Sequence, residues 1–202
     1  MYFNLQETDV LSKYQLLVGG VIPRPIAWIS SKSSAGINNL APYSFFTVAS
    51  CQPPVLSITQ VLPRDLKDKD TLRNLRETKE CVVNLVDLSA VEVMNSSCGN
   101  YPADVDEFTA LNIATVDSEF VDVVGVAHAP LRFECKLREI IEISNQPMGG
   151  SMILLDVLAV FVDDNCLVDN KIDPQLIAAV GKMGGDQYTK TAERFSLKRP
   201  IV

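Results

Sequence analysis

The hydrophobic positions of this chain recur mostly with the two-residue period of β-strands. Two long runs, residues 131–144 and 151–165, predict a pair of long strands, and the NQPMGG segment between them predicts a tight turn. The KSSAGINN segment, residues 32–39, gathers Ser, Gly and Asn and predicts another turn. The shorter runs rich in Ile and Val predict strands at residues 25–31, 40–50, 53–62 and 81–87.

Helical periodicity is confined to short stretches. Residues 68–80 combine leucines and charges at helical spacing, which predicts a short helix with Asp70 or Thr71 as its N-cap. Two further short helices are predicted at residues 89–97 and near residues 173–183.

These elements favour one mostly-β domain over residues 1–202, and we expect a closed barrel. Within the run 40–50, Pro42 cannot donate to a ladder and predicts a bulge or an irregular edge. The acidic segment 101–119 has neither period and predicts a surface excursion. A parallel α/β sheet is disfavoured, because it would need longer helices between its strands.

Composition and charge narrow the function class. The 202 residues include 25 acidic and 18 basic side chains, for a net charge of −7, which argues against non-specific binding of nucleic acid or of anionic membrane surfaces. Five scattered cysteines without a Cys-x-x-Cys pair predict reduced thiols, and therefore a cytoplasmic protein without a disulfide framework. The N-terminal residues lack the pattern of a secretory signal.

Few side chains could perform acid, base or nucleophilic chemistry. The only histidine, His128, lies in an apolar approach to a predicted strand, so a catalytic triad is not expected. A single histidine without paired cysteines also argues against a transition-metal site. Neither a P-loop nor a Gly-x-Gly-x-x-Gly motif is present. We therefore expect no catalytic side chain, which leaves a cofactor as the source of any chemistry.

Flavin mononucleotide (FMN) is a cofactor that the region 24–71 could serve. The candidate walls for its ring are Trp28, Pro42, Phe45 and Phe46. Hydroxyls and charge are available from Ser30, Ser31, Lys32 and Ser44. The predicted N-terminus of the helix in 68–80 would favour the phosphate, with support from Arg64, Lys67, Lys69 and Thr71. A strand hairpin followed by a capped helix is, however, more often a purely structural arrangement.

The order of three segments makes the interpretation more specific. The three segments are, in order, RPIAWISS (24–31), NNLAPYSFF (38–46) and KDT (69–71). Three further characteristic segments follow them: YPADVDEF, LRFECKL and the late KIDPQLIAAVGKMGGDQYTKT. In this combination the chain resembles the flavin reductase-like family of FMN-binding split-barrel flavoproteins, over nearly its whole length. The resemblance implies a six-stranded Greek-key split barrel that forms a homodimer, with FMN near the subunit interface.

The resemblance also implies a set of cofactor contacts. Four residues would line the flavin and reach its ribityl-phosphate: Trp28, Ile29, Ser30 and Ser31. Four more would contact the edge of the ring, largely through backbone groups: Asn39, Leu40, Ala41 and Ser44. Ser57 and Thr59 would approach from the third strand, while Lys69 and Thr71 would hold the phosphate end and Asp70 would cap the helix or orient Lys69. Lys182 stands where the family pattern suggests Arg, and so lacks the bidentate fork.

Three functions remain open at this point. The first is an NAD(P)H-dependent FMN reductase that passes hydride from nicotinamide to flavin and then supplies a monooxygenase or another electron acceptor. The second is a non-enzymatic FMN-binding electron carrier that a partner protein reduces. The third is a β-barrel interaction protein without a cofactor. The residues do not distinguish NADH from NADPH.

Overall fold

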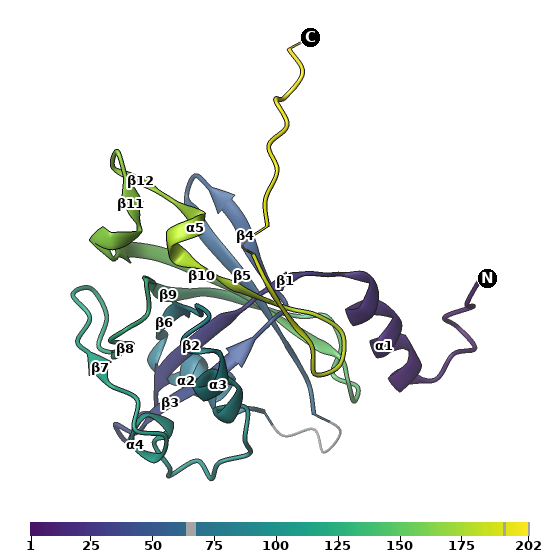
Figure 1. Cartoon of the computed structure of the whole chain (residues 1–202). Coiled ribbons are helices and arrows are strands. Elements are labelled where there is room, and N and C mark those ends of the chain that lie inside the picture. Colours follow the sequence, from purple (N-terminus) through teal and green to yellow (C-terminus); the bar gives the residue numbers. More distant parts are fainter. Residues whose placement is uncertain (64–67, 192, 202) are drawn as a thin grey trace.

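A curled antiparallel sheet of seven strands forms the body of the molecule (Figure 1). In spatial order the strands are β3 (Asn38–Tyr43), β2 (Ala27–Lys32), β6 (Glu80–Leu85), β9 (Leu131–Glu142), β10 (Gly150–Val162), β5 (Pro54–Val61) and β4 (Phe46–Cys51). The computed structural model describes residues 1–63, 68–191 and 193–201. The strands predicted at 53–62, 81–87, 131–144 and 151–165 are confirmed as β5, β6, β9 and β10.

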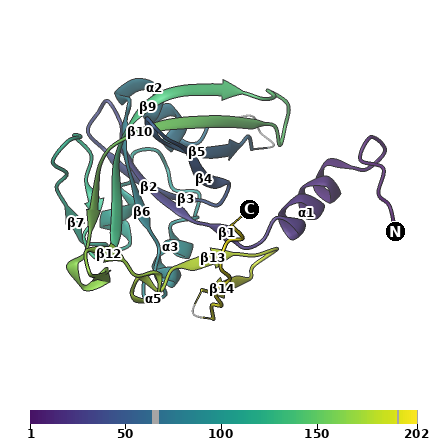
Figure 2. The same ribbon diagram turned by 90° about the horizontal axis from the view of Figure 1, so that it is seen from above.

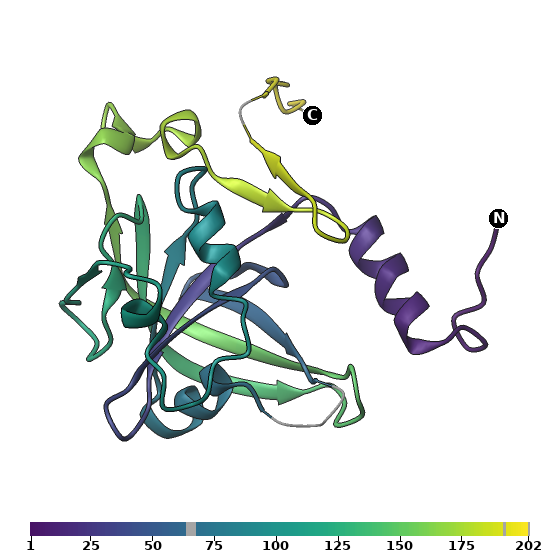
Figure 3. The ribbon, with the colours of Figure 1, turned by 60° about the horizontal axis from the view of Figure 1, so that its bottom comes forward.

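The sheet closes on itself at one short joint. Its two edge strands, β3 and β4, are consecutive in the chain, and only Ser44 and Phe45 separate them. The backbone N–H of Thr59, in β5, donates to the carbonyl oxygen of Phe45 at 2.8 Å, which holds the joint against the far side of the sheet. Both edges therefore meet here, and the sheet encloses a barrel (Figure 3).

This joint corrects one prediction. Residues 40–50 were expected to form one return strand, but the chain leaves β3 after Tyr43 and pairs with the opposite edge as β4. Splitting this run gives seven strands in the described sheet instead of six. The run predicted at 25–31 also divides, because β1 (Arg24–Pro25) pairs with β13 (Val180–Lys182) and only β2 joins the large sheet.

The barrel interior is filled by aliphatic side chains from several strands and one helix. In β2, Ile29 faces this interior, whereas the adjacent Trp28 faces a second apolar cluster outside the barrel wall. Both faces of β2 are thus buried, which explains its continuous apolar sequence. Helix α2 (Asp70–Thr78) covers one end of the barrel with Leu72 and Leu75, both fully buried.

The start of α2 differs from the prediction. The N-cap is Lys69, which makes no side-chain capping hydrogen bond, so the predicted caps Asp70 and Thr71 are wrong. Asp70 is instead the first helical residue, where its carboxylate lies near the positive end of the helix dipole. This carboxylate pairs with Arg73 one turn later, at 2.5 Å.

An 11-residue helix at the N-terminus, α1 (Val10–Gly20), was not predicted from the sequence. Asp9 caps it by accepting from the N–H groups of Leu11 and Ser12, at 2.9 and 3.0 Å. Only Val18 of this helix is buried, and Figure 2 shows α1 standing to one side of the barrel. No helix within the described ranges is long and apolar enough to cross a bilayer.

The remaining elements are short. The helix predicted at 89–97 is confirmed as α3 (Val91–Ser96). The helix expected near 173–183 is a single turn, α5 (Pro174–Ile177), because Ala178 adopts a left-handed conformation and β13 follows. The segment 101–119 contains α4 (Glu107–Ala110), whose Phe108 is buried, so it is only partly a surface excursion. The others are β7 (Thr115–Val116), β8 (Gly125–Val126), η1 (Asp164–Cys166), β11 (Leu167–Val168), β12 (Lys171–Ile172) and β14 (Tyr188–Lys190).

A buried arginine ties the chain's peripheral segments to the barrel. Arg24 donates to the carbonyl oxygens of Val18 at 2.5 Å, Val21 at 2.9 Å and Met183 at 2.9 Å. It also donates to the Oγ of Ser44 in the barrel joint, at 3.3 Å. Within the described part of the chain no carboxylate pairs with it. Arg24 therefore fixes the end of α1 and the β13–β14 hairpin through neutral acceptors.

Candidate functional site

A cavity of about 670 Å³ lies between β3, the N-terminus of α2 and the loop that follows α3. Its volume is in the range of cavities that hold small ligands and cofactors. The lining residues come from four separate chain segments that the fold brings together. They are Asn39, Ala41, Pro42, Pro63, Asp68, Lys69, Asp70, Thr71, Ser97, Cys98, Gly99, Asn100, Tyr101 and Glu107.

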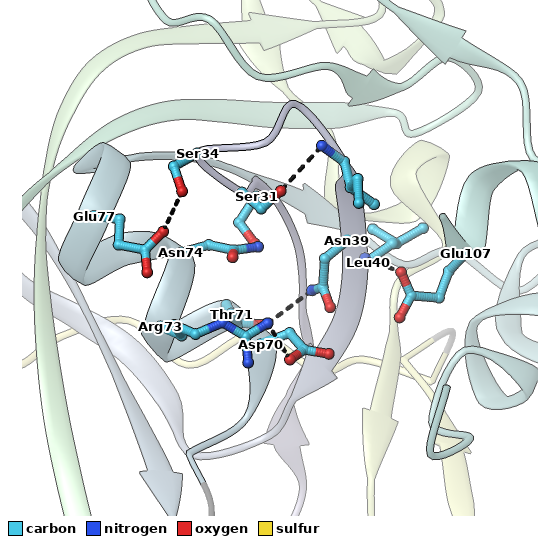
Figure 4. Close-up of polar contacts among 12 residues, drawn as sticks. Ser31, Ser34, Asn39, Leu40, Asp70, Thr71, Arg73, Asn74, Glu77 and Glu107 are labelled. Atoms are coloured by element: carbon cyan, nitrogen blue, oxygen red, sulfur yellow. Dashed lines mark hydrogen bonds and ion pairs between the residues drawn. The ribbon is translucent and has the colours of Figure 1, made fainter. Parts of the chain in front are cut away.

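The charges around the N-terminus of α2 favour an anion in this cavity. Asp70 forms an ion pair with Arg73 (Figure 4), and Asp68 forms one with Arg76. The negative charges of these two carboxylates in the cavity wall are therefore already compensated. Lys69 is exposed and makes no ion pair with the described residues. The first N–H groups of the helix and the Lys69 ammonium together form a positive end of the cavity.

Two buried hydrogen bonds hold β3 to its neighbours. Asn39 Nδ2 donates to Thr71 Oγ1 at 3.0 Å (Figure 4). The Tyr43 hydroxyl donates to Gln60 Oε1 at 3.4 Å. Burial raises the pKa of Tyr43 far above its ordinary value, so this phenol keeps its proton. These bonds hold the β3 wall of the cavity to α2 and β5.

Glu107 is a carboxylate buried in the cavity wall. It is 5% exposed and accepts from the Leu40 N–H at 3.1 Å, which ties α4 to β3 (Figure 4). Burial raises the pKa of Glu107 above its ordinary value, and that hydrogen bond opposes the shift only partly. The neighbouring Asp106 caps α4 by accepting from Phe108 N at 2.8 Å.

We predict that Glu107→Gln stabilises the fold increasingly as the pH rises. A carboxyl group with a raised pKa in the folded state contributes stability below its unfolded pKa and loses that contribution as the pH rises through the folded value. The variant minus unmodified difference in free energy of unfolding should therefore grow between pH 4 and pH 8. Urea denaturation at both pH values measures it, with Glu92→Gln on the exposed side of α3 as control. A difference that stays constant with pH would contradict the prediction.

A smaller cavity of about 250 Å³ adjoins the main one, and Pro42 and Lys69 border both. Its apolar wall comes from Tyr14 of α1 and from Pro42, Phe45, Val61 and Met148. Ser44, Thr59 and Gln60 supply its polar groups, together with Tyr43 and Lys69. An anion-attracting cavity thus adjoins one that gathers aromatic and aliphatic side chains, beside the joint that closes the barrel.

Some of the predicted cofactor contacts line the two cavities, and the others lie in the protein interior behind the cavity walls. Asn39, Ala41, Lys69, Asp70 and Thr71 line the main cavity, and Ser44, Thr59 and Lys69 line the smaller one. Among the candidate ring walls, Pro42 borders both cavities, Phe45 borders the smaller one, and Phe46 packs on the barrel core. Arg64 and Lys67, which the sequence suggested for the phosphate, lie outside the described residues.

Six predicted contacts lie behind these walls instead of in them: Trp28, Ile29, Ser30, Ser31, Leu40 and Ser57. Trp28 is fully buried, and its Nε1 donates to Ser97 Oγ at 2.9 Å, beneath the loop after α3. Ser31 is buried as well and accepts from Asn74 Nδ2 at 3.1 Å. The backbone of β2 is engaged by β3 on one side and β6 on the other, which leaves its main chain little freedom to meet a ligand.

Several lining residues were missed from the sequence. The loop Ser97–Tyr101 contributes five of them, although its composition indicates only a turn. Tyr14, Gln60 and Met148 come from segments without a motif, and Glu107 lies in the YPADVDEF segment, to which no contact was assigned. Lys182, for which the sequence left the role open, contacts the carbonyl oxygens of Gly185 and Gln187 and lies 4.3 Å from the Tyr188 ring centroid. It thus closes the turn between β13 and β14.

Comparison with known proteins agrees with this architecture. Residues 19–172 match the family model described as flavin reductase like domain. The structure is similar to nitrilotriacetate monooxygenase component B from Bacillus cereus, with TM-score 0.92, 30% identity and 98% of each chain covered. It is also similar to the 2-nitrobenzoate 2-nitroreductase NbaA of Pseudomonas fluorescens, with TM-score 0.89, 30% identity and coverage of 99% and 96%. A Shewanella frigidimarina structure described as a flavin reductase with a split barrel domain shares the fold, with TM-score 0.84, 22% identity and coverage of 99% and 100%.

Proposed function

Since the chain belongs to the flavin reductase-like family, we propose that it binds FMN across the two cavities and reduces it with NADH or NADPH. The observation that carries this proposal is the pairing of an anion-attracting cavity with an adjoining one whose wall includes Tyr14, Phe45 and Met148. A flavin mononucleotide has a phosphate at one end, which suits the first cavity, and a flat ring at the other, which suits the second. In this orientation the phosphate lies at Lys69 and the N-terminus of α2, and the ring lies towards Ser44 and Thr59.

The residues present fit such a ligand. The phosphate would be bound by the Lys69 ammonium and the first N–H groups of α2, while Arg73 and Arg76 neutralise the nearby carboxylates. Pro42, Phe45 and Met148 would pack against the ring. Asn39 and Ala41 border the path between the two ends. The six contacts behind the walls, Trp28, Ile29, Ser30, Ser31, Leu40 and Ser57, would support these groups from the core.

When bound, FMN supplies the electron-accepting ring, so the protein needs no acid, base or nucleophile of its own. The chain's residues would fix the ring's position, exclude water with the apolar wall of the smaller cavity and present N–H and O–H donors. The family relationship to a monooxygenase component B and to a nitroreductase supports an oxidoreductase, with a partner monooxygenase or a small molecule as electron acceptor.

An absorption spectrum followed by one anaerobic addition of nicotinamide cofactor tests this function. We expect purified protein supplied with FMN to show a bound-flavin spectrum that NADH or NADPH bleaches without a helper protein. A bound flavin that neither cofactor bleaches would instead indicate an electron carrier that a partner protein reduces. A protein that does not quench FMN fluorescence on titration would contradict the proposal and favour an interaction protein without a cofactor.

We also propose a homodimer that FMN stabilises. Helix α1 stands beside the barrel with Val10, Leu11 and Leu17 exposed by 47%, 44% and 57%, so an apolar face is available for a second copy. Leu17→Glu is expected to shift size-exclusion elution from dimer to monomer, and FMN is expected to shift the unmodified chain towards the dimer. Gln15→Glu, at an exposed position of the same helix, adds the same single negative charge and is the control. Monomeric elution of the unmodified chain with FMN present would contradict this proposal.

A further inference from the structure

Arg24 is a buried cation whose hydrogen-bond partners carry no charge, and its side chain reaches the wall of the smaller cavity. The residue is 6% exposed. Its guanidinium donates to three carbonyl oxygens and to the Oγ of Ser44. Burying a charge costs free energy unless an opposite charge compensates it. The neutral acceptors satisfy the hydrogen bonds of Arg24 but leave its positive charge uncompensated.

Ser44 connects this cation to the smaller cavity. It lies in the joint that closes the barrel, is half-buried and lines the cavity. The Nε–H of Arg24 can only donate, so the Ser44 oxygen accepts from it, at 3.3 Å. The hydrogen of the Ser44 hydroxyl is then left to donate, and it has no acceptor among the residues that the structure describes. Ser44 therefore offers the cavity a hydroxyl donor that the guanidinium behind it strengthens.

The charges around the smaller cavity are of one sign. Among its described lining residues, Lys69 is the only charged side chain, and none is a carboxylate. Arg24 adds a second positive charge from behind the wall. The whole chain has a net charge of −7, so this positive excess is a local feature. Because charges in a partly enclosed site are screened less than in water, it favours a ligand group that gains negative charge.

We propose that Arg24, acting through the Ser44 hydroxyl, makes the site bind the reduced flavin ring more tightly than the oxidised ring. This inference rests on the proposed function, which directs the phosphate to Lys69 and the ring towards Ser44. Hydride transfer from a nicotinamide delivers two electrons and one proton, so the reduced ring carries a negative charge that the oxidised ring lacks. The hydrogen bond from Ser44 to the ring therefore becomes charge-assisted on reduction. Arg24 is a positioning residue in this arrangement.

Three variants test the role of this pair. Ser44→Ala removes the hydroxyl and leaves the carbonyl bonds of Arg24, which anchor α1 and the β13–β14 hairpin, in place. Arg24→Gln removes the charge, and Arg24→Lys keeps it. Ser34→Ala is the matched control, because this hydroxyl donates to a carboxylate, Glu77, at 2.8 Å and lines neither cavity. Circular dichroism confirms that each variant is folded, and Ser44→Ala alone decides if the Arg24 variants are not.

The readouts are the dissociation constants of oxidised and of anaerobically reduced FMN, together with the midpoint potential of the bound flavin. Ser44→Ala is expected to weaken binding of reduced FMN about tenfold more than binding of oxidised FMN, the order of one charge-assisted hydrogen bond. This ratio lowers the two-electron potential by about 30 mV. Arg24→Gln is expected to lower the potential in the same direction, Arg24→Lys to stay close to the unmodified value, and Ser34→Ala to change neither readout.

The ratio of the two dissociation constants separates this role from a structural one. A purely structural contribution would weaken both forms of FMN alike, so a folded Ser44→Ala variant with an unchanged ratio and potential would overturn the inference while the proposed function stands. An unmodified chain that binds FMN in neither form would overturn both.

Discussion

The double variant Lys69→Met/Thr71→Val is expected to bind FMN about 30- to 900-fold more weakly than the unmodified chain, roughly 2–4 kcal/mol. Lys69 occupies the N-cap position of α2 at the positive end of the main cavity and lacks an ion-pair partner among the described residues, so its charge is available to a phosphate. The Thr71 hydroxyl accepts from Asn39 Nδ2, so its loss acts mainly by releasing the β3 wall.

Fluorescence titration of FMN with each single variant and the double variant measures this effect. Lys69→Met alone should account for most of the loss, because the hydroxyl acts through its neighbours. Lys171→Met, in the exposed strand β12, removes an equal charge away from the cavity and should leave the affinity unchanged. A folded double variant that binds FMN as tightly as the unmodified chain would place the phosphate elsewhere.

Trp28→Ala is expected to lower the free energy of unfolding by about 3–5 kcal/mol, the range for removing a large buried aromatic side chain. The indole is fully buried in the cluster outside β2, next to Met94 and Phe108, and donates to Ser97 Oγ. Removing it leaves a void beneath the loop Ser97–Tyr101, although the Ser97 hydroxyl still donates to the Met94 carbonyl oxygen at 2.7 Å. Because this loop lines the main cavity, affinity for FMN should fall as well.

Urea denaturation followed by far-ultraviolet circular dichroism measures the loss, since the variant has no other tryptophan to report by fluorescence. Trp28→Phe keeps most of the packing and should give an intermediate value. Phe195→Ala, at a side chain that is 87% exposed, should change stability by less than about 0.5 kcal/mol. A Trp28→Ala loss no larger than that of this control would mean that the second cluster contributes little to stability.

The sequence predicted the parts of the fold that local patterns determine. The long strands β9 and β10 were found because their alternation extends over twelve and thirteen residues. The barrel joint was not, because Ser44 and Phe45 carry no turn signature and apolar residues continue on both sides. Helix α1 was missed because most of its apolar residues are exposed and only Val18 is buried, so it is not an element that the barrel core requires. The left-handed Ala178 that ends α5 has no local signal either.

The candidate site was predictable only where it follows the resembling segments. Asn39, Ala41 and Lys69 were named in advance because their segments occur in the family's order. Gln60 was not found in this way, and neither was Glu107, although it lies in the resembling YPADVDEF segment. What distinguishes both residues is burial beside a cavity, which depends on contacts distant in the sequence. Trp28 shows the converse: its segment identifies the family, whereas its side chain packs in the core.

The neutral environment of Arg24 separates the anchoring of the peripheral segments from the charges at the ligand site. Carbonyl acceptors carry no charge that a proton could remove, so α1 and the β13–β14 hairpin are held to the barrel without help from any carboxylate of the described residues. A substitution that changes the charge at Asp68, Lys69 or Asp70 should therefore alter the ligand site and leave this anchoring in place.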